Sequence, residues 1–239
     1  MKNQATEVEK AEVLPAYIKK TLKFKEENVL QINIKYPEIK ISPADFYKKS
    51  AKKINNFYVS AVKNFEKYCE KILYKSAAFE FAAKKASDPD GLNDPEESSS
   101  FKPFGAVVTY EVAYNKHDFL CVYFDINIYF GKGRGNTIRK AQVWKLNGGE
   151  LMSSGKFIKF SRKTKYKICG YISEAMEKQI KNGEEYYKNS DIASVYRYLD
   201  ENNFYLSEKG YTFFFPQDTV ASQNSGVMSF EVPEKIISA

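Results

Sequence analysis

Apolar and polar residues alternate along several stretches of the chain. The segment 29–36 has an apolar residue at every second position, and 119–130 repeats this pattern. A period of two, with polar turns between the runs, is typical of antiparallel hairpins that pack one face against a core. Pro37 is expected to end the strand before it. The predicted strands cover 16–24, 29–36, 107–114, 119–130, 137–146, 204–206, 211–215 and 227–232.

Other stretches have helical spacing. Ser42 as an N-cap and Pro43 at the first helical position begin a helix that runs to about Ala86, either unbroken or with a break near Ser76. Its apolar residues recur mostly at steps of three, four or seven, which predicts one buried stripe. That stripe contains Tyr47, Ile54, Tyr58, Ala61, Phe65, Tyr68, Ile72 and Phe79. A further helix is predicted over 165–187. A second, short helix is predicted to begin at a cap formed by Ser190 and Asp191 and to end at Leu199.

This order of elements predicts an α+β fold. Antiparallel sheets would carry long amphipathic helices packed on one face, in two subdomains that share an interface. We expect a flexible leader over 1–15, an N-terminal subdomain over 16–114 and a C-terminal subdomain over 115–239. The acidic segment 88–100, rich in Pro, Gly and Ser, reads as a loop.

Composition narrows the class of protein. Of 239 residues, 43% are hydrophobic and 15% aromatic, which excludes intrinsic disorder. The formal charge is +7, and no apolar run approaches the roughly 18–20 residues of a membrane-spanning helix. Three separated cysteines indicate buried thiols rather than a disulfide framework, and a single histidine argues against most metallohydrolases. We therefore expect a folded, non-enzymatic protein without a metal or cofactor.

Several motifs have a plain structural interpretation. Gly131, Gly133 and Gly135 lack the dinucleotide spacing and precede a strand, so we interpret them as a tight connection rather than a phosphate cradle. The lysine-covered helix over 48–75 also carries acidic residues and matches no nucleic-acid motif, so a solvated face is favoured. His117 reads as a surface turn residue rather than a metal ligand.

Two features leave a catalytic alternative open. Cys121 alternates with apolar neighbours, and a nucleophilic cysteine normally needs a nearby base or positive charge, so a buried thiol is favoured. Asp125 and Asn127 share one strand face, with Asp118 near its start. Paired carboxylates there would suit acid–base chemistry on a carbohydrate, although a polar outer face explains the same residues.

Three segments carry a resemblance to a bacterial family. They are 110–115 with 119–124, the glycine-rich turn ending at Gly135-Asn136-Thr137, and the closing stretch from Asn203 to Pro233. Together they resemble the RsiV-like extracytoplasmic domain, a domain of unknown function numbered 3298. Residues 16–114 are similar to the companion domain that precedes it, which also occurs ahead of peptidoglycan deacetylases.

The resemblance implies a two-part α+β domain displayed outside the membrane. Its best-understood member is an anti-sigma factor whose outer domain binds lysozyme. This sequence departs from the family pattern at Arg134, where the family has histidine, and at Ser222-Gln223, where a Pro-Tyr pair is expected. Because those departures fall in turns, the fold carries over better than the ligand.

The leading hypothesis is a non-enzymatic binding or sensor module for a protein of the lysozyme kind or for a cell-wall glycan. Its alternative is a peptidoglycan- or carbohydrate-modifying enzyme that uses paired carboxylates. Localisation is expected to be cytoplasmic for the chain as written, and extracytoplasmic if an N-terminal anchor has been removed. Recognition is expected in the loops 131–136 and 217–226. The candidate binding residues are Lys132, Arg134, Asn136, Gln217, Asp218, Ser222, Gln223 and Asn224.

Overall fold

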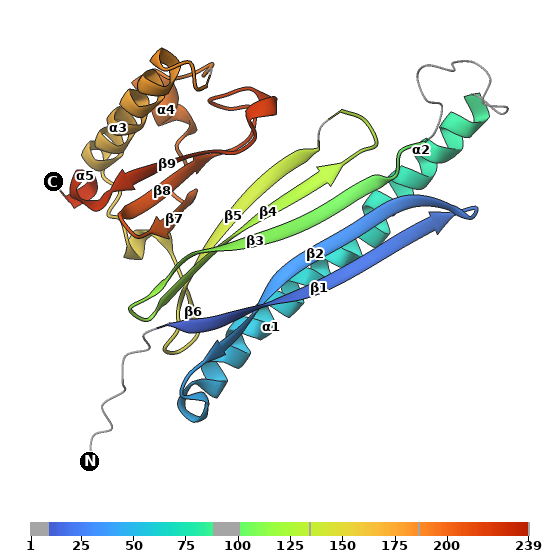
Figure 1. Ribbon diagram of the computed structural model, residues 1–239, viewed down its shortest axis with the longest axis horizontal. Helices are drawn as coiled ribbons and strands as arrows, with labels where there is room; N and C mark the ends of the chain where they lie inside the picture. Colours follow the sequence, from blue (N-terminus) through green and yellow to red (C-terminus); the bar gives the residue numbers. More distant parts are fainter. Residues whose placement is uncertain (1–9, 88–100, 134, 186, 239) are drawn as a thin grey trace.

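The computed structural model describes residues 10–87, 101–133, 135–185 and 187–238. Within these residues, the strands form a six-stranded sheet and a three-stranded sheet, joined and covered by helices (Figure 1). The predicted α+β fold is confirmed. The expected loop at 88–100 and most of the expected leader lie outside the described residues.

The six-stranded sheet follows the chain order β1 to β6. All neighbours are antiparallel except β2 and β3, which run parallel because a helical crossover connects them. The strands are β1 (Ala11–Phe24), β2 (Glu27–Ile41), β3 (Phe104–Lys116), β4 (Phe119–Tyr129), β5 (Asn136–Lys145) and β6 (Glu150–Met152).

Two hairpins of the large sheet turn through pairs of residues with left-handed backbone. Lys25 and Glu26 have φ of 47° and 67°, and His117 and Asp118 have φ of 50° and 65°. Two consecutive positive φ values suit the twist of hairpin strands. His117 is therefore an exposed turn residue, in the position that its place between the two strands predicts.

Both strands of the first hairpin extend past the prolines that were expected to bound them. β1 begins at Ala11, so Ala11–Pro15 form a strand where a flexible leader was expected. β2 continues through Pro37 to Ile41, and Pro37 lies opposite Pro15. β2 pairs with β3 only over Leu30–Ile34. Beyond this stretch one side of β2 is an edge, where a residue without an N–H is tolerated.

The crossover between β2 and β3 is one long helix that lies along the sheet (Figure 1). It comprises α1 (Ala44–Tyr68), a π-helical turn over Cys69–Leu73 and α2 (Tyr74–Ser87). Of the two alternatives for this helix, a break near Ser76 is absent from this described segment, and Pro43 rather than Ser42 occupies the N-cap. The π turn inserts one extra residue and thereby changes which helix face meets the sheet.

The helix buries apolar side chains against one face of the sheet. Tyr58 of α1 and Trp144 of β5 meet there, and the indole Nε1 donates to the Tyr58 hydroxyl oxygen over 2.8 Å. Farther along the helix, Leu73 in the π turn is buried, whereas Tyr68, Ile72 and Phe79 of the predicted stripe are 41%, 54% and 71% exposed. The stripe prediction is therefore right at Tyr47, Ile54 and Tyr58, and wrong at the exposed residues Ala61, Tyr68, Ile72 and Phe79.

The last third of the chain forms a smaller unit. Its three-stranded antiparallel sheet has the order β7–β8–β9. The side chains of Ser161 and Asp191 cap the N-termini of its two longer helices, as the sequence predicts for Asp191. Its elements are α3 (Arg162–Lys181), α4 (Ile192–Tyr198), β7 (Phe204–Ser207), β8 (Gly210–Phe215), β9 (Met228–Pro233) and α5 (Glu234–Ser238), with short 3-10 turns at Ser154–Lys156 and Gln223–Ser225.

The smaller unit packs on the face of the six-stranded sheet opposite the long helix (Figure 1). Cys121 of β4 and Val143 of β5 point to this side and join its buried core. On this side β7 of the small sheet meets β3, β4 and β5 of the large sheet. The boundary expected between residues 114 and 115 falls within the hairpin of β3 and β4, so the sheet continues across it.

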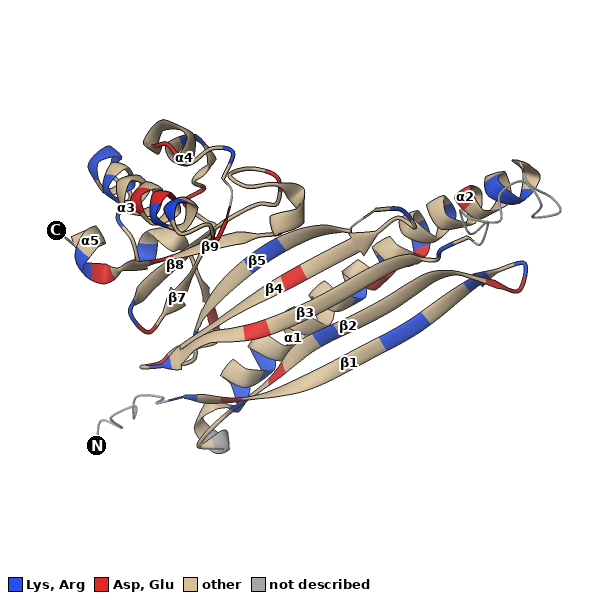
Figure 2. Ribbon diagram, turned by 45° about the horizontal axis from the view of Figure 1, so that its top comes forward, with Lys and Arg blue, Asp and Glu red and all other residues tan. Residues whose placement is uncertain are grey.

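Charged residues occur on the helices, in the turns and in the bodies of the strands (Figure 2). No helix in the described ranges is long and apolar enough to cross a membrane. Basic and acidic segments also lie side by side in the middle of β5 and β4 (Figure 2), on the large sheet itself.

Candidate functional site

A cleft separates part of β5 from the smaller unit. β6 pairs only with Val143–Lys145, so within the described residues the edge of β5 from Asn136 to Gln142 has no neighbouring strand. The hollow beside this edge measures about 190 Å³. It is lined by Asn136, Thr137, Ile138, Arg139, Lys140, Asn203, Phe214, Pro216 and Gln217.

Gln217 links the loop 217–226 to the start of β5, directly after the loop 131–136. Its Oε1 accepts a hydrogen bond from the backbone N–H of Thr137 at 2.8 Å, at the open edge of β5. Its Nε2 donates to the backbone oxygen of Gln223 at 2.7 Å. One side chain therefore satisfies an edge N–H and holds the loop 217–226 against the start of β5. Residues 80 positions apart in the chain thus share one surface.

The first loop presents polar residues at the rim of this cleft. Gly131 and Gly133 have φ of 76° and 61°, a conformation that a side chain would strain. A Cβ at Gly131 would also lie 2.8 Å from the backbone oxygen of Lys102. Lys132 and Asn136 are exposed, and Asn136 lines the cleft. The placement of Arg134 lies outside the described residues.

The second loop is partly buried, contrary to the expectation of a fully exposed polar segment. Val220 and Ala221 are 0% and 2% exposed. The backbone oxygen of Val220 accepts from the N–H of Lys188 at 2.8 Å, and Ala221 forms an isolated β-bridge with Tyr187. Two small apolar residues therefore anchor the loop, and their backbone groups are paired.

The polar residues of this loop differ in their surroundings. Asp218 forms an ion pair with Lys188, and the hydroxyls of Ser222 and Ser225 are hydrogen-bonded to each other at 3.2 Å. Gln223 and Asn224 are exposed at the tip. Among the predicted binding residues of this loop, Gln217, Asp218 and Ser222 thus hold its shape through their side chains, whereas the Gln223 side chain is exposed.

A polar cluster that the sequence did not reveal lies behind the cleft. Arg139 of β5 is directly opposite Asp125 of β4, and its Nε and Nη2 donate to the two carboxylate oxygens, each over 2.7 Å. Nη1 donates to the hydroxyl of Ser229 in β9 at 2.9 Å. The guanidinium also lies 4.2 Å from the ring centroid of Tyr123, which stacks on Tyr205 of β7 at 4.7 Å.

The electrostatics of this cluster favour a fixed positive charge. Burial alone would lower the pKa of the Arg139 guanidinium, but the hydrogen bonds and charge of Asp125 outweigh burial and raise that pKa. Burial raises the pKa of the Tyr123 hydroxyl, while the charge of Arg139 acts against this rise. The charged, bidentate contact therefore joins β4 to β5 within the large sheet, and the hydrogen bond to Ser229 connects it to the smaller unit.

The structure does not bring the candidate acids together. Asp125 faces Arg139, and Asn127 donates from its Nδ2 to the hydroxyl of Thr137 at 2.9 Å. Asp118 lies at the far end of β4, where its Oδ1 accepts from the backbone N–H of Asn147 at 2.7 Å. Each of these side chains thus has a structural partner.

The cysteines are isolated and protected. Cys69, Cys121 and Cys169 are all free and buried. Burial raises the pKa of Cys121 to about 12 and that of the other two thiols to about 11. At neutral pH they are protonated, which suits packing rather than nucleophilic attack. Over the described ranges, His, Cys, Asp and Glu nowhere gather in a group of three or more that would suit a metal ion.

One protein-family model matches part of the chain. Residues 156–235 match the model of a family described as "Protein of unknown function (DUF3298)". This match covers the smaller unit, from the 3-10 turn before α3 into α5. No curated protein matches the chain.

Two solved structures share the fold over nearly the whole chain. A member of the DUF3298 family from Bacteroides fragilis is 15% identical, with 98% of this chain and 94% of that chain covered and a TM-score of 0.68. A DUF3298 family protein from Pseudomonas aeruginosa is 10% identical, with 96% and 93% covered and a TM-score of 0.54. At these identities the likeness concerns the fold alone. It includes the large sheet and long helix as well as the matched segment.

Proposed function

We propose that this protein is a non-enzymatic binding module of the RsiV-like kind, with the cleft beside β5 as its recognition surface. Its ligand would be a protein such as lysozyme or a cell-wall glycan. The observation that carries the proposal is the Gln217 side chain, which ties the loop 217–226 to the open edge of β5 at Thr137, the residue that follows the loop 131–136. Recognition would require no metal or cofactor.

The cleft offers groups that suit either ligand. An open strand edge presents backbone donors and acceptors, which pair with an extended peptide segment or with sugar hydroxyls. The exposed amide of Asn136 lines the cleft, and the exposed amide of Gln223 belongs to the residue whose backbone oxygen accepts from Gln217. Each amide supplies both a donor and an acceptor, so the rim is able to match alternating hydroxyl or peptide groups.

The base of the cleft is preorganised. Arg139 is held by Asp125 and Ser229, and Gln217 holds the loop above it. A surface that is already fixed loses little conformational entropy when a ligand binds. Because its side chains are already fixed, the cleft is a better binding surface than the lysine-covered outer face of the long helix.

A pull-down with immobilised lysozyme and with insoluble peptidoglycan tests the proposal. The variant carrying Lys132→Ala and Asn136→Ala removes two exposed rim side chains without touching a buried group. We expect the unmodified protein to bind one of the two ligands, and this variant to bind it at least about tenfold more weakly. Lys52→Ala, on the exposed side of α1, is the matched control and should bind as the unmodified protein does.

Failure would take one of two forms. If the folded protein binds neither ligand, the proposed ligand classes are wrong. If the rim variant and the Lys52→Ala control bind equally well, the ligand does not use the cleft.

A second experiment restores the family-like loop. Ser222 has φ of −66° and ψ of 160°, a backbone that proline adopts, and Gln223 is exposed, so Ser222→Pro with Gln223→Tyr fits the loop. A rigid proline and an aromatic side chain favour protein recognition. We expect the exchange to strengthen lysozyme binding. Equal affinity of the unmodified and exchanged proteins would contradict the role given to this loop.

A further inference from the structure

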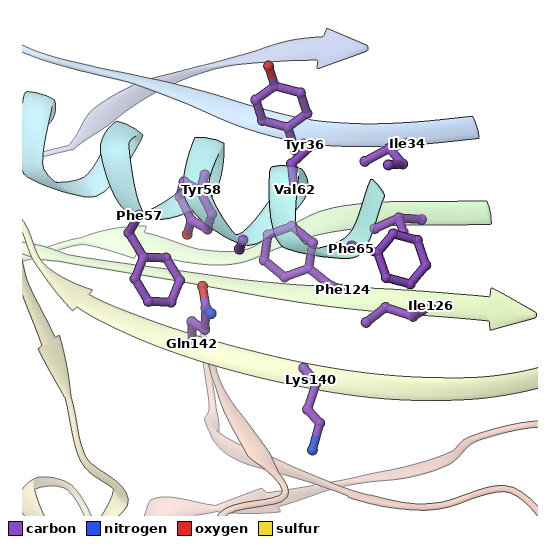
Figure 3. Close-up of a pocket in the computed structure, with 12 residues that line it drawn as sticks. Ile34, Tyr36, Phe57, Tyr58, Val62, Phe65, Phe124, Ile126, Lys140 and Gln142 are labelled. Atoms are coloured by element: carbon purple, nitrogen blue, oxygen red, sulfur yellow. The ribbon is translucent and has the colours of Figure 1, made fainter. Parts of the chain in front are cut away.

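A second cavity lies on the opposite side of the large sheet, between α1 and the helix-facing side of β2 to β5 (Figure 3). Its volume is about 180 Å³. Phe57 and Phe65 of α1, Tyr36 of β2, and Phe124 and Ile126 of β4 contribute to an almost wholly apolar wall. Phe57 is 37% exposed, so the cavity reaches the surface there.

One polar side chain enters this apolar space. The Gln142 amide points from β5 toward Phe57 and Phe124 (Figure 3). Its Oε1 is buried and, among the described residues, has no hydrogen-bond partner. A buried carbonyl oxygen without a donor is costly, and most buried polar side-chain atoms in folded proteins are paired.

The neighbouring polar groups do not supply the missing donor. The Tyr58 hydroxyl oxygen accepts from Trp144 Nε1, and no hydrogen bond joins Tyr58 to Gln142 in the described structure. The ammonium of Lys140 points away from the cavity (Figure 3). An apolar space with a single unsatisfied acceptor is therefore complementary to an apolar group that carries one donor.

We propose that this cavity binds a flat aromatic ring bearing an O–H or N–H group, of the phenol or indole class, which donates to Gln142 Oε1. The size is suitable, because an apolar cavity of about 150 Å³ holds a benzene molecule. The aromatic walls provide edge-to-face contacts for such a ring. This site is independent of the cleft, since its principal walls belong to the helix-covered face of the sheet.

The single tryptophan gives a direct readout. The chain has one Trp, so the Trp144 indole N–H yields one signal in a proton–nitrogen NMR spectrum. That N–H is bonded to Tyr58, which lines the cavity. Titration with phenol should shift this signal in a saturable manner. Anisole, which has the same ring without the donor, should bind about 3- to 10-fold more weakly, the factor expected from one net hydrogen bond.

Two variants test the hydrogen bond to Gln142 and the space of the cavity separately. Gln142→Leu removes the acceptor, so phenol and anisole should bind equally and the thermal midpoint should not fall. Ala61→Phe places a ring at the cavity from an exposed position of α1, and should abolish binding of both compounds. Val59→Phe, at another exposed position of α1 that does not line the cavity, is the matched control and should leave binding unchanged.

Three results would overturn the proposal. They are the absence of a saturable shift with phenol or indole, a preference for phenol that survives Gln142→Leu, and undiminished binding to a folded Ala61→Phe variant. Loss of lysozyme or glycan binding at the cleft would not bear on any of them, so the two proposals fail separately.

The same chemistry occurs in free compounds and in peptides. N-acetyltyrosinamide carries the phenol ring on a peptide-like backbone and distinguishes these sources. Saturable binding of N-acetyltyrosinamide as well as phenol would assign a tyrosine or tryptophan side chain of a peptide, and binding of phenol alone would assign a free small molecule. Both results support a donor-bearing ring at Gln142.

Discussion

The two faces of the large sheet are built from the same strands but hold their partners differently. On the helix-covered face, β4 contributes Leu120 and Val122, which are completely buried among apolar side chains. On the other face the same strand contributes Asp125, which binds Arg139 and through it the smaller unit. Alternation along one strand thus separates a hydrophobic core from a partly polar interface.

The two faces differ in how precisely their side chains must be positioned. Apolar packing depends mainly on volume and burial, whereas the opposite face depends on a few directed contacts. Both candidate ligand sites lie where these arrangements are incomplete. The cleft has an open strand edge, and the helix-side cavity has an unpaired amide oxygen in Gln142.

The largest effect is expected from the hydrophobic face. Leu120→Ala deletes a fully buried side chain and leaves a cavity, so the free energy of unfolding should fall by about 2–5 kcal/mol. Ile138→Ala, on the same face but 47% exposed, is the matched control and should cost less than about 1 kcal/mol. Urea unfolding measures both values. Equal losses would contradict the assignment of Leu120 to the core.

An intermediate effect is expected from the charged contact on the other face. The Arg139 and Asp125 side chains are 13% and 27% exposed, so Asp125→Asn leaves a largely buried guanidinium without its counter-charge. The free energy of unfolding should fall by about 1–3 kcal/mol. Combining Asp125→Asn with Arg139→Met should cost less than the sum of the single changes.

The exposed pair of Lys116 and Glu208 provides the control for that contact. Its side chains are 55% and 72% exposed, and solvent screens their attraction. Glu208→Gln should therefore give no measurable change in urea unfolding. A loss as large as that of Asp125→Asn would show that burial does not distinguish the two pairs.

The sequence predicted the fold better than the sites. Alternation of residues identified the hairpin of β3 and β4, and Asp191 identified the start of α4. Heptad spacing from Tyr58 onward gave the wrong buried face, because a seven-residue repeat drifts by about 20° per heptad on a straight helix. Tyr68 is already 41% exposed before the π turn, which then adds a further residue.

The sites depend on contacts between distant residues, which a single sequence does not specify. Nothing local marks Gln217 as the partner of Thr137, and Arg139 becomes the partner of Asp125 only when the register of β4 and β5 is fixed. Gln142 resembles an ordinary solvent-facing strand residue, and only the position of α1 places its amide in an apolar cavity. For Asp125 and Arg139, an acid and a base at matching distances from the turn between two strands would have been a usable signal.

The smallest effect is expected at the loop contact. Gln217→Ala removes the acceptor for the Thr137 N–H and the donor to Gln223, so unfolding should become about 1 kcal/mol easier. Amide exchange at Thr137 should accelerate while exchange in the core of β4 stays unchanged. Unaltered exchange at Thr137 would show that Gln217 does not protect the strand edge.

The central claim is that ligands are recognised at the cleft formed by the edge of β5 and the loop 217–226. Hydrogen–deuterium exchange of the unmodified protein, with and without lysozyme or soluble peptidoglycan fragments, tests it most directly. The account predicts that a bound ligand slows exchange in residues 135–140 and 217–226 and leaves α1 unchanged. Binding that slows exchange only in α1, or in neither loop, would contradict the claim.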